Sequence, residues 1–119
     1  MRLLIAGSRD WDVTVDEIHR AIAEHVPRDA TITEVVSGKA RGADRAGERW
    51  AKLSGIPVTP FTADWTKYGK AAGPIRNTAM ADYADIAIVF QRNNSTGSQD
   101  MIDKMKARGK YVGIVRRIG

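Results

Sequence analysis

Short apolar runs alternate along this chain with segments whose apolar residues recur at helical spacing. Continuous apolar runs at 3–6 and 86–90 are typical of strands buried inside a parallel sheet. The complete pattern predicts five strands, over 3–6, 31–36, 56–61, 86–90 and 111–115. Two prolines, Pro57 and Pro60, place the third strand at an edge of the sheet.

Helices are predicted between these strands. Apolar residues at helical spacing mark helices over 15–26, 43–53, 75–83 and 98–105, while 63–72 is expected to be a loop or a short helical turn. Strands that alternate with helices favour right-handed crossovers. We therefore expect one α/β domain spanning 1–119, a doubly wound and mostly parallel five-stranded sheet with helices on both faces. Ligands of such sheets bind beyond the carboxyl ends of the strands.

The amino-acid composition excludes some classes of function and favours others. With 119 residues, 43% of them apolar, the chain can bury one core. It has no cysteine and no apolar stretch near the roughly 20 residues that span a bilayer, so we expect a cytoplasmic protein without a membrane partner. His19 and His25 are predicted to be solvated on different faces of the first helix. No metal and no cofactor is expected. The net charge of +5 favours anionic partners.

Four glycine-bearing loops carry the candidate chemistry. Each follows a predicted strand or precedes a predicted helix; they cover 6–9, 37–44, 73–77 and 95–98. Loops that connect a strand to a helix in this way expose backbone N–H groups at the positive end of a helix dipole. All four loops should meet at one edge of the sheet, and several carry basic side chains. This combination predicts a phosphate-bearing ligand.

The first two loops contain hydroxyl, guanidinium and glycine groups. Gly7 would let a ligand approach the backbone, while Ser8 and Arg9 would hold a phosphate. In the second loop, two glycines bracket two cations without the Gly-Lys-Ser/Thr ending of a P-loop; the candidates are Gly38, Lys39, Arg41 and Gly42. Asp44 either caps the following helix or contacts a ribose hydroxyl or a catalytic water.

The later loops add aromatic and polar candidates. Trp65 or Tyr68 could stack on a base. Trp65 could equally serve to pack its own loop against the rest of the protein. Arg76 and Asn77 are predicted in the first turn of a helix, where a cation opposes the dipole and an anion would relieve it. The remaining candidates are Asp64, Gly73, Ser95, Gly97 and Ser98.

These motifs together resemble a known group. Residues 7–9, 38–44, 63–65, 69–77 and 97–98 look like the YspA-type, YpsA-related branch of the SLOG superfamily, small Rossmann-like proteins of bacteria and phages. The resemblance implies a nucleotide or nucleotide-derived ligand, such as one containing ADP-ribose. The protein would then act as a sensor or sequestering module. The superfamily also implies a homodimer.

Resemblance to two related groups of proteins implies alternatives to a sensor or sequestering function. Arg76, Asn77 and Met80 match in part the Arg-Lys-x-x-Met motif of lysine-decarboxylase-like phosphoribohydrolases, which cleave an N-glycosidic bond. Met101 stands where that group has its catalytic glutamate, so Asp100 or Asp44 would have to act at the anomeric carbon. Residues 35–44 are similar to a segment of the DNA-processing protein that loads recombinase, which implies binding of single-stranded DNA.

Overall fold

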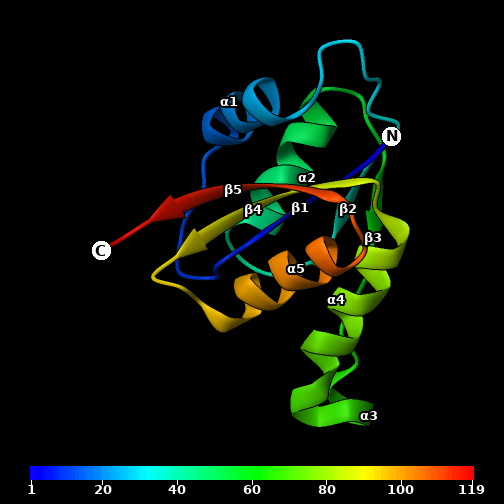
Figure 1. Ribbon diagram of the computed structural model, residues 1–119, viewed down its shortest axis with the longest axis vertical. Helices are drawn as coiled ribbons and strands as arrows, with labels where there is room; N and C mark the ends of the chain where they lie inside the picture. The colour runs from blue at the N-terminus through cyan, green and yellow to red at the C-terminus, as the bar shows by residue number, and fades with distance from the viewer.

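The computed structural model describes residues 1–119, and its elements alternate as predicted (Figure 1). The strands are β1 (Arg2–Gly7), β2 (Glu34–Ser37), β3 (Val58–Pro60), β4 (Ile86–Arg92) and β5 (Tyr111–Arg117). The helices are α1 (Val15–His25), α2 (Ala43–Leu53), α3 (Trp65–Tyr68), the 3₁₀ turn η1 (Gly69–Ala71), α4 (Ala72–Tyr83) and α5 (Thr96–Ala107).

The five strands form one sheet in the order β3-β2-β1-β4-β5. Every neighbouring pair is parallel, which confirms the predicted doubly wound α/β fold. As expected from its prolines, β3 lies at an edge. The chain reverses its direction of travel between β1 and β4, so the switch point lies at the carboxyl ends of these two strands.

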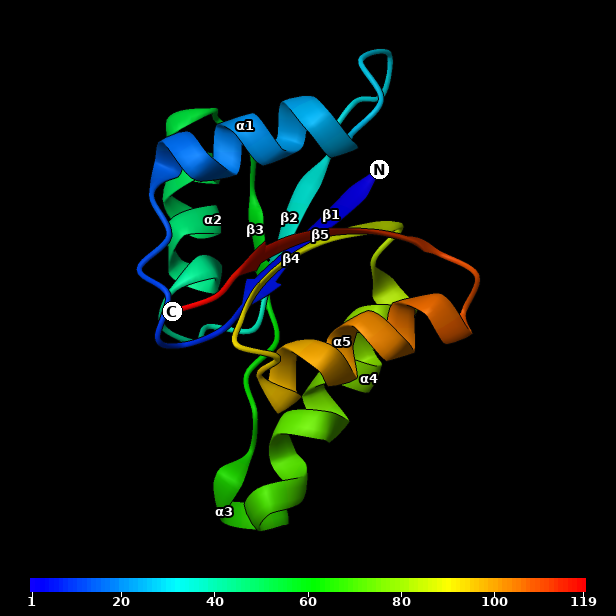
Figure 2. The ribbon, with the colours of Figure 1, turned by 60° about the vertical axis from the view of Figure 1, so that its left-hand side comes forward.

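Alternating residues of the central strands build two cores. Leu3 and Ile5 of β1 face the layer of α1 and α2, while Leu4 and Ala6 face the layer of α4 and α5. Figure 2 shows these two helical layers on opposite sides of the sheet. Helix α1 starts at a capping box, in which Thr14 and Glu17 satisfy each other's backbone N–H groups.

The segment after β3 differs from the prediction. Asp64 caps the short helix α3 by accepting a hydrogen bond from Lys67 N, and α4 then begins at Ala72 rather than at 75. Pro74 fits the first turn of α4, where its missing N–H has no partner to lose. Arg76 and Asn77 consequently lie in the second turn, so the prediction that a cation there opposes the helix dipole was wrong. The start of α4 and α3 project away from the sheet (Figures 1 and 2).

One histidine also departs from its prediction. His25 is half-buried against β5: its Nδ1 lies 2.8 Å from the hydroxyl of Tyr111, and its ring occupies the space that a side chain at Gly113 would need. His19 is exposed as expected. The longest apolar segment in any helix falls short of what is needed to cross a membrane.

Candidate functional site

A cleft of about 700 Å³ opens at the carboxyl edge of the sheet, at the switch point. Its walls come from the loops after β1, β2 and β4, from Trp65 of α3, from α4 as far as Met80 and from the start of α5. Most of the candidate residues lie along it: Gly7, Ser8, Arg9, Asp44, Trp65, Gly73, Arg76, Asn77, Ser95, Gly97, Ser98 and Asp100. The topology thus brings together loops that are up to 90 residues apart in the chain.

Three serine hydroxyls form a cluster at the start of α5. The Oγ of Ser8 lies 2.6 Å from that of Ser95 and 3.3 Å from that of Ser98, and Ser95 and Ser98 are 2.8 Å apart. Ser8 also accepts a hydrogen bond from the backbone N–H of Arg92, which fixes its position. No side chain caps α5, although Ser95 is at its N-cap. The hydroxyls therefore bond to one another and leave the first-turn N–H groups of α5 available to an anion.

Two of the glycines are required by packing. A side chain at Gly7 would place its Cβ 2.5 Å from the carbonyl oxygen of Phe90, because β1 and β4 approach closely here. Gly42, with φ of +79°, would place a Cβ 2.7 Å from the carbonyl oxygens of Ser8 and Trp11. Gly42 thereby allows the loop before α2 to pack against the loop that carries Ser8 and Arg9.

Asp44 organises the second loop from within. Its side chain is buried, and Oδ2 accepts hydrogen bonds from the N–H groups of Gly38 at 3.1 Å and Ala40 at 3.4 Å. It therefore holds the loop before α2, and not the N-terminus of the helix. Burial raises the pKa of Asp44 from 3.8 to about 6, against the opposing effects of these N–H groups and of the positive charge on Arg76.

Arg76 faces the same loop from α4. Its Nη1 donates a hydrogen bond of 3.1 Å to the carbonyl oxygen of Gly38, while its Nε is buried and has no partner. Burial lowers the pKa of this guanidinium, and Asp44 partly offsets that effect. The backbone of Gly38 is thus fixed at both of its peptide groups, by Asp44 at the N–H and by Arg76 at the C=O. A buried N–H without an acceptor is costly, so Nε is a natural donor to a ligand.

Asp100 belongs to a network between α4 and α5. Its Oδ2 accepts hydrogen bonds from Asn77 Nδ2 at 3.0 Å and from Lys104 Nζ at 2.8 Å. Asn77 is buried and also reaches the carbonyl oxygen of Gly97 at 3.5 Å. Lys104 completes the link by donating to the carbonyl oxygen of Pro74. Asn77 therefore positions the start of α5 and the Asp100 carboxylate relative to α4.

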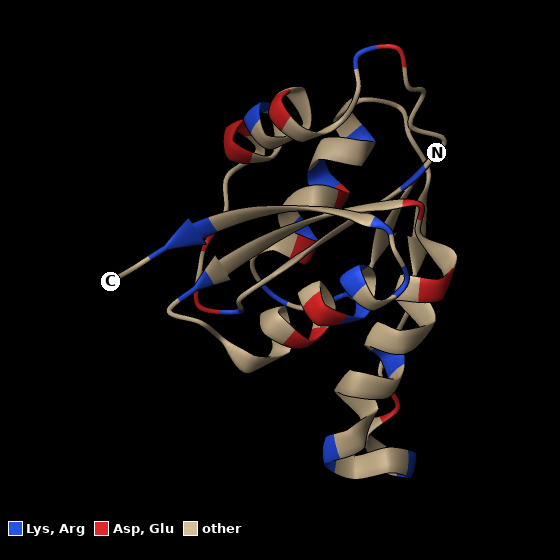
Figure 3. Ribbon diagram, in the orientation of Figure 1, with Lys and Arg blue, Asp and Glu red and all other residues tan.

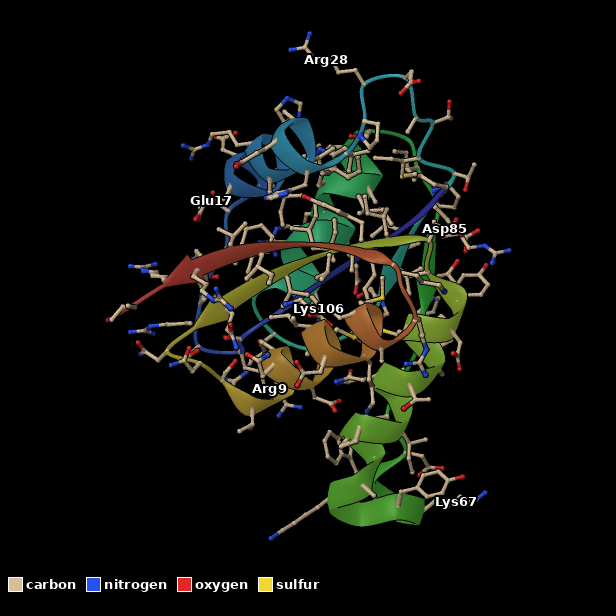
Figure 4. The ribbon with its side chains drawn as sticks, viewed as in Figure 1. Arg9, Glu17, Arg28, Lys67, Asp85 and Lys106 are labelled. Carbon is tan, nitrogen blue, oxygen red and sulfur yellow. The ribbon has the colours of Figure 1, made fainter.

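An aromatic side chain and a guanidinium form the rim of the cleft. The guanidinium of Arg9 lies 5.7 Å from the ring centre of Trp65, and 49% of Trp65 is exposed. Gly73 lies under this ring, where an added Cβ would be 3.4 Å from Trp65. Figure 4 shows Arg9 beside the first turns of α5. The exposed indole is thus held across the cleft opening and could cover a planar group.

The other candidates lie outside the cleft. Lys39 forms an ion pair of 2.9 Å with Glu48, and Gly38 is buried behind Asp44 and Arg76. Asp64 serves as the cap of α3, and Arg41 and Gly42 lie on the turn that leads into α2. Tyr68 lines a smaller groove on the other side of Arg76, together with Phe61 and Ile75.

The sequence reasoning gave no role to Asp10, which lines the cleft beside Arg9. Lys70 and Thr96 also line the cleft; Thr96 lies inside the predicted loop 95–98, and Lys70 lies in the segment 69–77 that carries the family resemblance. Met80, which matches the methionine of the Arg-Lys-x-x-Met motif, is a buried core residue that touches the cleft from α4.

Comparison with known proteins identifies a family and a phage relative. The family model described as YspA, cpYpsA-related SLOG family matches residues 1–68, from β1 to the end of α3. A protein called Gene 61 protein, from Mycobacterium phage D29, is 36% identical, over 91% of this chain and 90% of its own length. No solved structure matches the chain.

Proposed function

The chain belongs to the YspA, cpYpsA-related SLOG family, whose membership indicates a nucleotide-related function, and from this premise we propose that it binds a nucleotide or nucleotide-derived ligand in the cleft. In this proposal the protein either senses that ligand or sequesters it. A ligand that contains ADP-ribose is the specific candidate, because it would offer phosphates, riboses and a base to one continuous cleft.

The serine cluster at the start of α5 is the observation that carries this proposal. Three hydroxyls within 3.3 Å of one another exceed what a helix cap needs, and none of them caps the helix. A phosphate placed there would receive hydrogen bonds from Ser8 and Ser98 and from the first-turn N–H groups, at the positive end of the dipole.

The remaining contacts follow from the same placement. Arg9 would reach a phosphate oxygen from the rim, and Trp65 would stack on the base. Arg76 would donate its unpaired Nε to a ribose or phosphate oxygen. Met101, which stands where the phosphoribohydrolases have a glutamate, is buried beside α4 and also lines the cleft, where it offers no carboxylate. This position supports binding without turnover by that group's glutamate.

A charge placed at Gly97 tests the proposal. No atom lies within 4 Å of a Cβ built there, and a carboxylate in the first turn stabilises a helix, so Gly97→Asp should keep or raise the melting temperature. It should nevertheless abolish the thermal shift given by AMP, ADP-ribose or NAD, because the new carboxylate repels the phosphate. Gly97→Asn is the neutral control and should retain the shift. If Gly97→Asp binds as wild type does, or no nucleotide shifts wild type, the proposal fails.

Asp44 favours a second candidate, hydrolysis of an N-glycosidic bond. A carboxyl in the cleft with a pKa of about 6 exists in both protonation states near neutral pH, as a general acid or base requires. Water would add to the anomeric carbon, the bond to the base would break, and the base would leave with a proton. Wild type would then release free base from AMP, and Asp44→Asn would not. Absence of free base after prolonged incubation of wild type would leave binding alone.

A further inference from the structure

The charged side chains on the outer face of α2 are all basic, and the exposed Leu53 ends this face of the helix. Arg45, Arg49 and Lys52 are exposed at helical spacing, and Arg41 is exposed on the turn just before the helix. The opposite face packs into the core through residues such as Ala46 and Trp50. Figure 3 shows basic residues recurring along α2. We call Arg41, Arg45, Arg49 and Lys52 the α2 basic stripe.

No group within the protein pairs with this stripe. None of its four side chains makes a hydrogen bond or an ion pair, including with α1, which packs beside α2. Of the two acids of α2, Asp44 is buried, and Glu48 is partly exposed but bonded to Ser37 and Lys39. The outward face of this helix therefore presents a field of one sign.

Most of the stripe opposes the stability of its own helix, although Lys52 lies in the last turn, where the dipole favours a base. Arg45 lies in the first turn of α2, where the dipole favours an acid over a base. Arg45 and Arg49 are four residues apart, and Arg49 and Lys52 three, so neighbouring like charges repel. Solubility does not require this arrangement, because acids would serve it as well and would suit the start of the helix better. An external polyanion would remove all of these conflicts.

We propose that the α2 basic stripe docks the protein on the phosphate backbone of DNA, without reading its sequence. Within α2 the rise from Arg45 to Lys52 is about 10 Å, and Arg41 on the preceding turn extends the stripe beyond the start of the helix. Each DNA strand offers a phosphate about every 3.4 Å of axis, so several phosphates lie within reach of the four cations. This function goes beyond ligand binding in the cleft, which contains none of the stripe residues.

Salt dependence measures how many phosphates the stripe neutralises. Four contacts predict that affinity for duplex DNA falls about 150-fold between 50 and 200 mM salt. In Arg45→Ala/Arg49→Ala, two contacts remain and the fall should be only about 12-fold. Both side chains are exposed and unpaired, and their mutual repulsion is removed, so the variant should melt at or above the wild-type temperature.

A matched double variant separates the stripe from net charge. Arg20→Ala/Arg28→Ala removes two exposed and unpaired arginines from α1 and the loop after it; Figure 4 shows Arg28 pointing outward from that loop. The experiment measures binding of a labelled 20-base-pair DNA of mixed sequence by fluorescence anisotropy at several salt concentrations. The control should keep the wild-type affinity and slope, and the stripe variant should lose both.

Equal losses in the two variants would overturn the proposal, as would failure of wild type to bind the duplex. Binding to vesicles of anionic lipid in place of DNA would also overturn it. The Gly97→Asp variant should still bind DNA, and Arg45→Ala/Arg49→Ala should still show the thermal shift with nucleotides. The docking surface and the cleft can therefore fail independently of each other.

Discussion

Replacing Asp44 with asparagine should stabilise the protein above pH 6. Asp44 is only 3% exposed, and burial raises its pKa from 3.8 to about 6. At about 1.4 kcal/mol per pH unit, this shift means that ionising the folded carboxyl costs about 3 kcal/mol. Asparagine keeps an oxygen that accepts from the N–H groups of Gly38 and Ala40, but it carries no charge to desolvate.

The sign follows from proton binding. Between about pH 4 and pH 6 the unfolded chain has released the Asp44 proton while the folded protein retains it. The contribution of Asp44 to stability is therefore intact below pH 4, is lost as the pH rises to about 6, and stays lost at higher pH. The advantage of Asp44→Asn should grow from less than about 1 kcal/mol at pH 4 to about 3 kcal/mol at pH 7.

Urea denaturation of wild type and Asp44→Asn between pH 4 and pH 8 measures this difference directly. Asp12→Asn is the matched control, since it removes an exposed carboxylate that makes no hydrogen bond, and it should keep the wild-type dependence on pH. Curves for wild type and Asp44→Asn that remain parallel over the whole range would refute the reasoning. So would a loss of stability in Asp44→Asn that grows with pH.

Three further substitutions test the packing and the rim of the cleft. Met101→Glu would place a carboxylate at a buried position in the wall of the cleft, so urea denaturation should show a loss of about 3–5 kcal/mol. The variant should show no hydrolysis, and a stable variant that releases base would contradict the account. Gly42→Ala should lower the free energy of unfolding by at least about 1–3 kcal/mol, because φ is +79° and two carbonyl oxygens block the Cβ. Trp65→Ala should weaken nucleotide binding by about 1–3 kcal/mol in calorimetry, with little change in melting temperature because the ring is half exposed; unchanged affinity would exclude stacking.

The fold was predictable because, at nearly every helix and strand, the spacing of the apolar residues and the residue types favour the same secondary structure. The buried runs at 3–6 and 86–90 identified β1 and β4, whose carboxyl ends form the switch point and hence the cleft. Local signals failed where tertiary contacts decide. Arg76 looked like a first-turn residue because Pro74 suggested a helix start, but α4 begins at Ala72 after a 3₁₀ turn.

The direction in which side chains point was the second feature of the site that the sequence could not predict. Lys39 and Arg41 stand in the most suggestive loop, yet one is paired with Glu48 and the other is exposed beside α2, because Asp44 turns the backbone of that loop inward. The hydroxyls of Ser8 and Ser98 are 90 residues apart and meet only through the pairing of β1 with β4. Such contacts between distant loops depend on the order of the strands in the sheet, and the loop motifs alone do not reveal that order.

Backbone amide NMR spectra recorded during titration with ADP-ribose would test the central claim most directly. Binding in the cleft predicts that the largest shift changes fall on the loops of Ser8 and Gly38 and on Gly97 and Ser98 at the start of α5. Residues 45–52 of α2 should stay unchanged in the same titration. Shift changes spread over α2, or none at the start of α5 when ADP-ribose binds, would contradict the account.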